Sequence, residues 1–228
     1  MDLLSNHKKN YAIIFLLFSK GENKMLKKFA ADALGISDIG KIISPEDYDK
    51  VIADDYIMHE DEEKIFFLIK SKTDEYCFTN LAFIHVDGTS AVSSKRLIKR
   101  YDYYKHKISD VTIETAGTVD LDCELKFRMD EQAFSIDVTR HQLEQLKDIY
   151  KALIKISHVI EENRLLLEKS ETSLSIAATA CGSQRQESGN VLEYFIKVNE
   201  YSFNWMKQSR DLYIQKDFSE IFKNYINN

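Results

Sequence analysis

Residues 64–138 carry the hydrophobic pattern of short β-strands, and no helical pattern interrupts it. Apolar or alternating runs recur at 65–69, 75–86, 95–104, 109–115, 119–129 and 133–138. A kink or break at Thr79-Asn80 divides the second run, so six or seven strands are expected. Parallel strands need crossover connections of about a dozen residues or more, and this segment has no room for them. The segment therefore predicts an antiparallel meander closed as a small sandwich or barrel.

The pattern becomes helical at Thr139. The run from Thr139 to Gln142 has the T-x-x-Q form of a capping box, which marks the start of a helix. Apolar residues then recur every seven positions, at Leu146, Leu153, Ile160, Leu167, Leu174 and Cys181. One helix over 140–181 would reach roughly 60 Å at 1.5 Å per residue. A domain of this size is only about 30–35 Å across, so the helix must leave the domain or break near residues 161–163.

A second helix is expected from about Val191, after a polar turn at 182–190. Residues 218–226 mark a final short helix. A helical hairpin of this kind cannot bury all its apolar residues within itself, and exposed apolar stripes indicate a partner. Another copy of the same chain is the simplest partner. The candidate oligomerisation residues are Leu153, Ile160, Leu167, Leu174, Tyr194, Val198, Tyr201 and Trp205.

The first 24 residues do not fit this organisation. Their apolar run at 11–18 is too short to span a bilayer, and no signal-peptide cleavage pattern follows it. Residues 20–25 can be encoded by a bacterial ribosome-binding site followed by a start codon, so we expect translation to begin at Met25. A membrane tether or signal, or ordinary N-terminal structure, are the alternatives. Short helices are expected at 26–34 and after Ser44, which would cap a turn beginning at Pro45.

Composition narrows the function. The chain has 228 residues, a net charge of −6 and a pI of about 5.6, so no nucleic-acid partner is expected. Its three cysteines lack metal-ligand spacing, which favours idle thiols in a reducing cytoplasm and no metal or cofactor. Nucleophile-elbow, phosphate-loop, dinucleotide and HExxH motifs are absent, so we expect no enzyme activity. His85, on an apolar strand, is interpreted as a core residue.

The strand region resembles the bacterial pleckstrin-homology-like (PH-like) domain family from Met25 to about Ile156. The residues that carry the resemblance are Glu75-Tyr76-Cys77-Phe78-Thr79-Asn80, Ile84-His85-Val86-Asp87-Gly88, Ser93-Ser94-Lys95-Arg96, Ile108-Ser109-Asp110-Val111 and 114–121. The tail from Ser157 to Asn228 resembles the helical hairpin of the YvbH-like subgroup. The resemblance implies an α+β chain: a PH-like antiparallel sandwich, a helix that closes one end, and a long helical hairpin. It also implies ring-shaped homo-oligomers without known catalysis, and domains at 25–156 and 157–228.

The basic segment 95–107 has three interpretations: an edge strand protected by charge, a protein contact, or a site for anionic lipid or nucleic acid. Eukaryotic PH domains use a basic pattern in their first hairpin, which this chain lacks. An acidic run at 54–63 could face the basic strand of a neighbouring copy in a ring. The polar turns resemble the family's hydrophilic surface. The candidate partner-binding residues are Lys72, Asp74, Thr79, Asn80, Ser94, Lys95, Arg96, Lys99 and Arg100.

The sequence therefore predicts a cytoplasmic, non-enzymatic scaffold that forms a cyclic homo-oligomer and binds a further protein. The alternative is a peripheral membrane module that binds anionic lipid through the basic strand.

Overall fold

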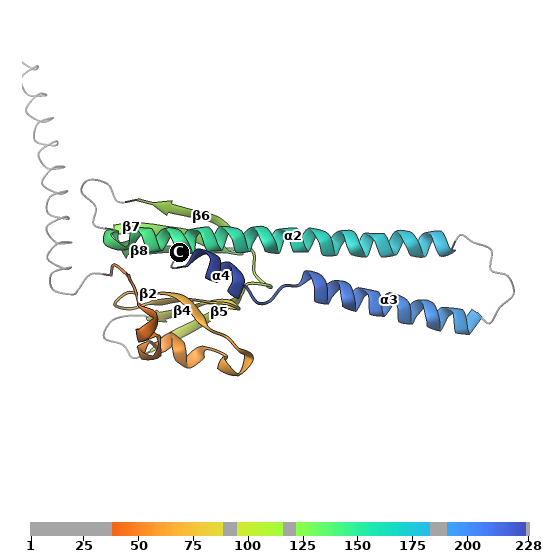
Figure 1. Ribbon diagram of the computed structural model, residues 1–228, viewed down its shortest axis with the longest axis horizontal. Helices are drawn as coiled ribbons and strands as arrows, with labels where there is room; N and C mark the ends of the chain where they lie inside the picture. Colours follow the sequence, from red (N-terminus) through yellow and green to blue (C-terminus); the bar gives the residue numbers. More distant parts are fainter. Residues whose placement is uncertain (1–37, 89–94, 116–121, 183–190, 227–228) are drawn as a thin grey trace, which may run out of the picture. The chain divides into compact units, whose positions relative to one another are not determined.

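Five strands form the first sheet, in the order β1-β2-β3-β4-β5, with every neighbouring pair antiparallel (Figure 1). They are β1 (Lys41–Ile42), β2 (Ile65–Lys70), β3 (Glu75–Thr79), β4 (Ala82–Gly88) and β5 (Arg96–Asp102). The computed structural model describes residues 38–88, 95–115, 122–182 and 191–226, and Gly40–Asn228 form one unit. The expected helix at 26–34 and the segment 1–24 lie outside the described residues.

The long strand run at 75–86 is divided, as predicted, at Thr79-Asn80. The Thr79 hydroxyl oxygen accepts hydrogen bonds from the backbone N–H groups of Leu81 (3.1 Å) and Ala82 (2.8 Å). These bonds hold a tight turn between β3 and β4. The two strands then pair in register from Glu75 opposite Val86 to Phe78 opposite Phe83.

Three strands form the second sheet, in the order β6-β7-β8. They are β6 (Ile108–Glu114), β7 (Asp122–Met129) and β8 (Gln132–Thr139), and β7 alternates strictly between buried and half-buried residues. The sheets meet at Gly40, whose N–H donates to the Asp137 carbonyl (2.8 Å) and whose carbonyl accepts from the Thr139 N–H (3.1 Å). A Cβ at Gly40 would lie 2.6 Å from the Ile69 side chain, so only glycine fits this close approach.

The space between the sheets holds an aromatic core. Phe83 lies at its centre, with ring centroids 4.9 Å from Phe78, 5.1 Å from Phe127 and 4.9 Å from Phe134. All four side chains are buried. Edge-to-face and offset ring pairs of this kind add to the stabilisation gained from burial.

Three short 3-10 helices, η1 (Pro45–Lys50), η2 (Ile52–Tyr56) and η3 (His59–Asp61), cover the other face of the first sheet. They complete a second cluster of buried residues, comprising Val51, Ala53, Ile57, Leu68, Cys77, Ala82, Ile84 and Val86. Ser44 is the N-cap residue before Pro45, as predicted. Its backbone carbonyl accepts from the Asp47 N–H (3.0 Å), and the side chain makes no capping bond.

The helical segment begins after Thr139, as predicted, but the predicted capping box is wrong. The chain passes through a short 3-10 helix, η4 (Arg140–Gln142), and the Thr139 side chain makes no capping bond. The Gln142 amide instead bonds both backbone groups of Ile42, at 2.8 Å and 3.0 Å. Gln142 thus satisfies the polar backbone of the short edge strand β1, which would otherwise lack partners on that side.

The helix that follows, α2 (Leu143–Gly182), is continuous over 40 residues, so it leaves the domain without breaking. α3 (Val191–Tyr213) runs back beside it, and α4 (Ser219–Tyr225) returns to the domain (Figure 1). None of the helices in the described residues is both long and apolar enough to cross a membrane. The predicted α+β arrangement is confirmed.

α4 packs into the core of the domain, although it lies in the segment 157–228. The Phe218 N–H donates to the Asn80 carbonyl (2.9 Å), and Phe218 packs edge-on against Tyr103 with centroids 5.6 Å apart. Phe222 stacks on Phe66 at 5.2 Å. Phe218 and Phe222 are fully buried. The end of the hairpin is therefore anchored against α2 and the first sheet.

Candidate interaction surfaces

The distal half of α2, from about residue 161 to its end, faces α3 along one narrow stripe. Beyond Ile160, the half-buried residues are Asn163, Leu167, Ser170 and Leu174, which recur at intervals of three and four. On α3, Ser209 is buried and Trp205 is half-buried against this stripe. Helical spacing places these residues on the facing sides of the two helices. The seam between α2 and α3 thus accounts for Leu167, Leu174 and Trp205, whereas Ile160 packs against the core of the domain.

The candidate oligomerisation residue Leu153 needs correction. Its side chain is fully buried, in one cluster with the inter-sheet core and with Phe218 and Phe222. A fully buried side chain cannot contact another copy. Leu153 continues the seven-residue repeat, but the domain itself covers this part of α2.

α3 carries exposed apolar residues on both sides of the seam. What we call the first flank comprises Tyr194, Val198, Tyr201 and Leu212. The second flank comprises Leu192, Phe195, Ile196, Phe203 and Met206. A helix turn of 3.6 residues places the two sets on either side of the line through Ser202 and Ser209. Tyr201 is 69% exposed and Phe203 is 62% exposed, so the described residues cover neither flank.

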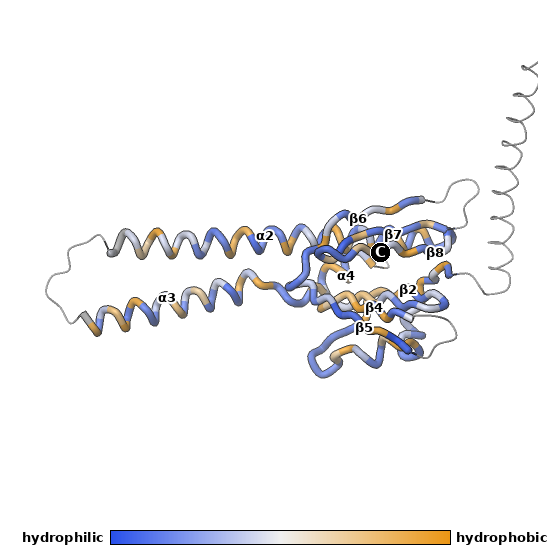
Figure 2. Tube along the Cα trace, turned by 180° about the vertical axis from the view of Figure 1, so that it is seen from behind, coloured by the Kyte–Doolittle hydropathy of each residue, from blue (hydrophilic) through white to orange (hydrophobic). Residues whose placement is uncertain are grey.

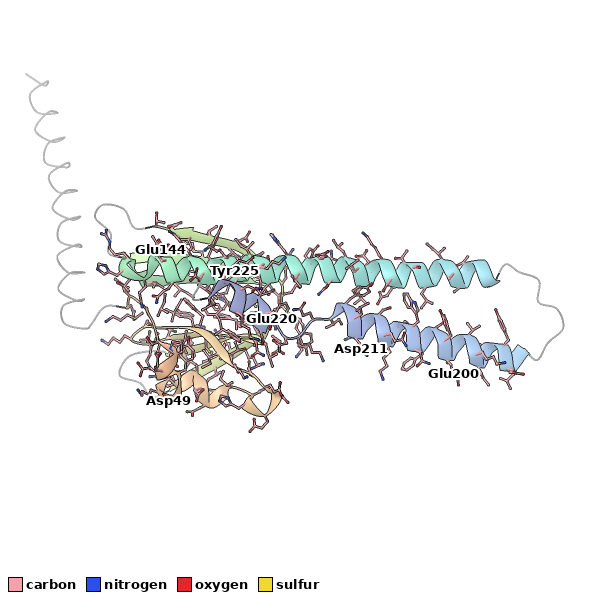
Figure 3. The ribbon with its side chains drawn as sticks, in the orientation of Figure 1. Asp49, Glu144, Glu200, Asp211, Glu220 and Tyr225 are labelled. Carbon is pink, nitrogen blue, oxygen red and sulfur yellow. The ribbon has the colours of Figure 1, made fainter. Side chains whose placement is uncertain are left out.

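The remaining face of α3 is polar. Figure 3 shows Glu200 and Asp211 on the side of α3 that points away from α2. Figure 2 shows hydrophobic and hydrophilic bands alternating along both helices. On α2, Leu165, Leu166 and Ile176 are also exposed. The hairpin therefore offers apolar surface in separate bands bounded by charge.

Sequence reasoning found the first flank and missed the second. A single apolar stripe was expected on α3, and it comprised Tyr194, Val198, Tyr201 and Trp205. Leu192, Phe195, Phe203 and Met206 form another set at helical spacing. A search for two stripes would have found both flanks.

A second candidate surface lies on the domain, around the β2–β3 turn and β5. Lys72 and Lys95 are exposed, and Arg96 is half-buried with its guanidinium 3.2 Å from the Lys95 carbonyl. The Lys99 ammonium lies 3.7 Å from Asp87. Asp74 lies 3.0 Å from Nε2 of the buried His85, which stacks on Tyr76 at 4.7 Å. His85 is thus part of the packed interior, and Ser94 lies outside the described residues.

Thr79 and Asn80 are buried and cannot form part of this surface. The Thr79 hydroxyl donates to Glu63 (2.5 Å), and the Asn80 side-chain oxygen accepts from the Lys64 N–H (2.8 Å). Both side chains are at most 1% exposed. Their polar groups hold the β3–β4 turn and the residues that precede β2.

Arg100 is bound within its own chain, to a residue of the acidic run. Its guanidinium contacts both carboxylate oxygens of Glu63, at 3.0 Å and 2.9 Å, and donates to Asp102 at 2.7 Å. The Glu63 side chain is completely buried. Burial opposes the charge on Asp102, but its bonds to Lys105 and Arg100 hold its pKa below the ordinary value. The predicted contact between copies at Arg100 is therefore corrected to an internal ion pair.

The rest of the acidic run lies at the surface. Asp55, Glu60, Asp61 and Glu62 are exposed, and Asp54 lies 3.4 Å from His59. Within residues 38–88, 95–115, 122–182 and 191–226, no group of three or more His, Cys, Asp and Glu side chains could hold a metal ion.

Comparison with family models identifies two matches that meet near the point where α2 leaves the domain. Residues 33–157 match the bacterial PH domain, and residues 168–228 match the YvbH-like oligomerisation region. The uncharacterized protein YvbH of Bacillus subtilis (strain 168) is 56% identical over 204 residues, which cover 90% of this chain and 100% of that protein.

Solved structures were compared with this chain as well. A PH domain containing bacterial protein from Exiguobacterium sibiricum 255-15 is 49% identical, with a TM-score of 0.77, over 83% of this chain and 100% of that one. A DUF1696 family protein with a pleckstrin-homology domain from Shewanella loihica PV-4 has a TM-score of 0.42 at 20% identity, over 53% of this chain and 99% of that one. The Exiguobacterium protein supports the PH-like fold along most of the chain.

Proposed function

The chain belongs to the bacterial PH domain family and carries a YvbH-like oligomerisation region, and from this premise we propose that it is a non-enzymatic, cytoplasmic scaffold that forms a cyclic homo-oligomer. Self-association proceeds through the hairpin, and the domain presents a polar surface to another protein. The observation that carries the proposal is the uncovered apolar surface on α3. The buried free thiols of Cys77 and Cys123 fit a reducing compartment.

The two flanks of α3 support a ring over a simple pair. A two-fold dimer uses one self-complementary patch, whereas a cyclic assembly needs two different patches that meet head to tail. The first flank carries two tyrosines and a valine, and the second carries two phenylalanines, a methionine and an isoleucine. We propose that the first flank of each copy packs against the second flank of the next.

A pair of charge substitutions tests this arrangement. Tyr201→Glu places a carboxylate in the first flank and Phe203→Glu places one in the second, and burying an unpaired charge at an interface is strongly unfavourable. Light scattering coupled to size-exclusion chromatography should give single chains for each variant. Asn204→Glu, on the exposed polar face of α3, should assemble like the native protein.

Mixing the two variants distinguishes the modes of contact. In the head-to-tail arrangement, the intact first flank of Phe203→Glu meets the intact second flank of Tyr201→Glu, so an equimolar mixture should form dimers and nothing larger. If each flank paired with its own kind, each variant alone would still dimerise through its unaltered flank. That result, with native helix content by circular dichroism, would contradict the proposed ring.

We propose that the second binding surface consists of Lys72, Asp74, Lys95, Arg96 and Lys99. Polar rims of this kind favour specificity and association rate. The identity of the bound protein can be approached by crosslinking in cells, with Lys72→Glu/Lys95→Glu as the comparison variant. The proposal requires that this variant lose a crosslinked partner while it keeps the native oligomer mass.

The alternative function is binding of anionic lipid through β5. A basic side chain near an anionic membrane contributes about 1 kcal/mol. On β5, however, Arg100 is held by Glu63 and Asp102, and Lys99 lies beside Asp87. Flotation with vesicles containing phosphatidylserine, at low and high salt, separates the two functions. Salt-sensitive flotation that Lys95→Glu abolishes would favour the membrane function.

A further inference from the structure

A cavity of about 390 Å³ lies where the hairpin leaves the domain. Its walls come from four segments that are far apart in the sequence: the β5–β6 turn at 104–107, Asp130 in the β7–β8 turn, α2 at 160–167, and residues 213–215 after α3. This volume is within the range of pockets that bind small molecules. Neither candidate interaction surface explains it.

Apolar side chains make up one part of the lining. Ile160 and Leu167 come from α2, and Tyr213 and Ile214 come from the end of α3. All four side chains are half-buried, so part of their apolar surface remains accessible. Removing such surface from water favours a ligand with an apolar body.

Both acids of the lining are hydrogen-bonded to neighbours. The Asp130 carboxylate lies 2.6 Å from Nδ1 of His106 and accepts from the Lys107 N–H at 2.8 Å. Glu161 accepts two bonds from Arg164, at 3.0 Å and 2.9 Å. These contacts lower the pKa of both carboxyl groups, His106 contributing most for Asp130 and Arg164 most for Glu161.

One cation of the lining has no ion pair of its own. Lys105 bonds Asp102 at 2.6 Å, whereas the Lys107 ammonium has no carboxylate within ion-pair distance in the described part of the chain. Lys216 lies over the Tyr104 ring, 5.5 Å from its centroid, at the same rim. Apart from His106, the lining carries three cations, Lys105, Lys107 and Arg164, against two carboxylates, Asp130 and Glu161, so cations are in excess by one.

We propose that this cavity binds a small amphipathic anion, a carboxylate joined to an apolar body. The carboxylate lies by Lys107, and the apolar body lies against Ile160, Leu167 and Ile214. Because the walls belong to both the domain and the hairpin, the bound ligand also stabilises the position of the hairpin where it joins the domain. The proposal does not depend on self-association.

Calorimetric titration of the full chain with sodium octanoate tests the proposal. Octanoate should bind saturably, and octylammonium and 1-octanol should bind at least about tenfold more weakly. Lys107→Glu should weaken octanoate binding at least about tenfold. Lys151→Glu, an exposed lysine on α2 outside the cavity, should leave the affinity unchanged. Asn163→Trp, which fills the cavity from α2, should abolish binding.

The exposed flanks of α3 could also take up octanoate, so the titration is repeated with Phe203→Glu. Retained binding in that variant supports the cavity as the site, whereas loss of binding there overturns the proposal. Equal affinity for octanoate and octylammonium, or native affinity in folded Lys107→Glu, also overturns it. So does the absence of saturable binding at millimolar octanoate.

Discussion

The two halves of α2 carry the same seven-residue repeat and meet opposite environments. In the proximal half, Leu146, Ile149, Leu153 and Ile156 are completely buried in the core of the domain. In the distal half, no described residue beyond Ile156 is fully buried, and Ile176 is 65% exposed. The sheets and α4 cover the first half, whereas α3 covers the second along one narrow seam.

This difference shows that the repeat fixes which residues share a helix face, but not what covers that face. In the proximal half the cover comes from the same chain, including Phe218 and Phe222 from the far end of the sequence. In the distal half the cover within the chain is incomplete, and the two flanks of α3 add to the exposed surface. Stability should therefore depend mainly on the proximal half, and assembly on the distal half.

The largest expected effect comes from deleting residues 215–228. The deletion removes Phe218, Ile221 and Phe222 from the core, and loss of a buried phenylalanine side chain alone costs about 3–5 kcal/mol. The combined loss is comparable to the whole unfolding free energy of an ordinary domain, about 5–15 kcal/mol. We therefore expect no cooperative thermal unfolding. Differential scanning calorimetry provides the measurement.

A matched deletion keeps α4 and shortens the hairpin. Replacing residues 171–202 with a short Gly/Ser linker removes most of both flanks and leaves the proximal half of α2 intact. This variant should unfold cooperatively as a single chain. If it fails to fold while the 215–228 deletion folds normally, the assignment of stability to the proximal half is wrong.

The next largest effect on stability should come from the ion pair between buried Glu63 and Arg100. Arg100→Met leaves Glu63 buried without its cation, which should cost about 3–5 kcal/mol of unfolding free energy. Lys99→Met, one residue away on the strand, breaks only a half-exposed contact and should cost less than about 1 kcal/mol. Urea denaturation of both variants measures the difference. Equal effects would contradict an internal role for Arg100.

Alanine substitution in each half of α2 sharpens the comparison directly. Leu153→Ala creates a cavity in the core and should cost about 2–5 kcal/mol. Leu174→Ala removes a half-buried side chain from the seam and should cost about 1 kcal/mol or less. The melting temperature at low protein concentration reports both. A larger loss at Leu174 would place the stabilising contacts in the distal half.

The smallest effect on stability should come from protonation of Asp130, which lies beside the middle of α2. Because the folded-state pKa of Asp130 is lowered below 3.8, the stability it contributes is present above about pH 4 and is lost as the pH falls through the lowered pKa. Its carboxyl is half-exposed, so the contribution stays below about 1 kcal/mol. Melting curves of the native protein and Asp130→Asn should differ at pH 7 and converge near pH 2.5. A difference in melting temperature that stays the same at all pH values would show that ionised Asp130 is not its cause.

Much of the fold follows from local pattern. The strand run, the division at Thr79-Asn80 and the helix from Leu143 depend on neighbouring residues, so periodicity and turn chemistry predict them. Periodicity left open whether this helix would break near residues 161–163. The expected cap at Thr139 failed because Gln142 bonds Ile42, which is 100 positions away in the sequence. A local motif cannot reveal a competing partner of that kind.

The sites were less predictable for the same reason. The pairing of Glu63 with Arg100 and the packing of α4 against α2 and the first sheet require the folded chain, since no sequence pattern links their positions. The sequence indicated a basic strand and an acidic run, but it did not indicate that they meet within one chain. By contrast, both flanks of α3 are local patterns, and the second was missed only because one stripe was sought.

The most direct test is the molar mass of the native chain in solution as a function of its concentration, measured by sedimentation equilibrium. We expect a defined assembly that is a whole-number multiple of 26.6 kDa and persists into the low micromolar range. A helical, cooperatively folded protein that stays at 26.6 kDa into the high micromolar range would show that water, and no second copy, covers the flanks of α3. That result would contradict the proposed assembly.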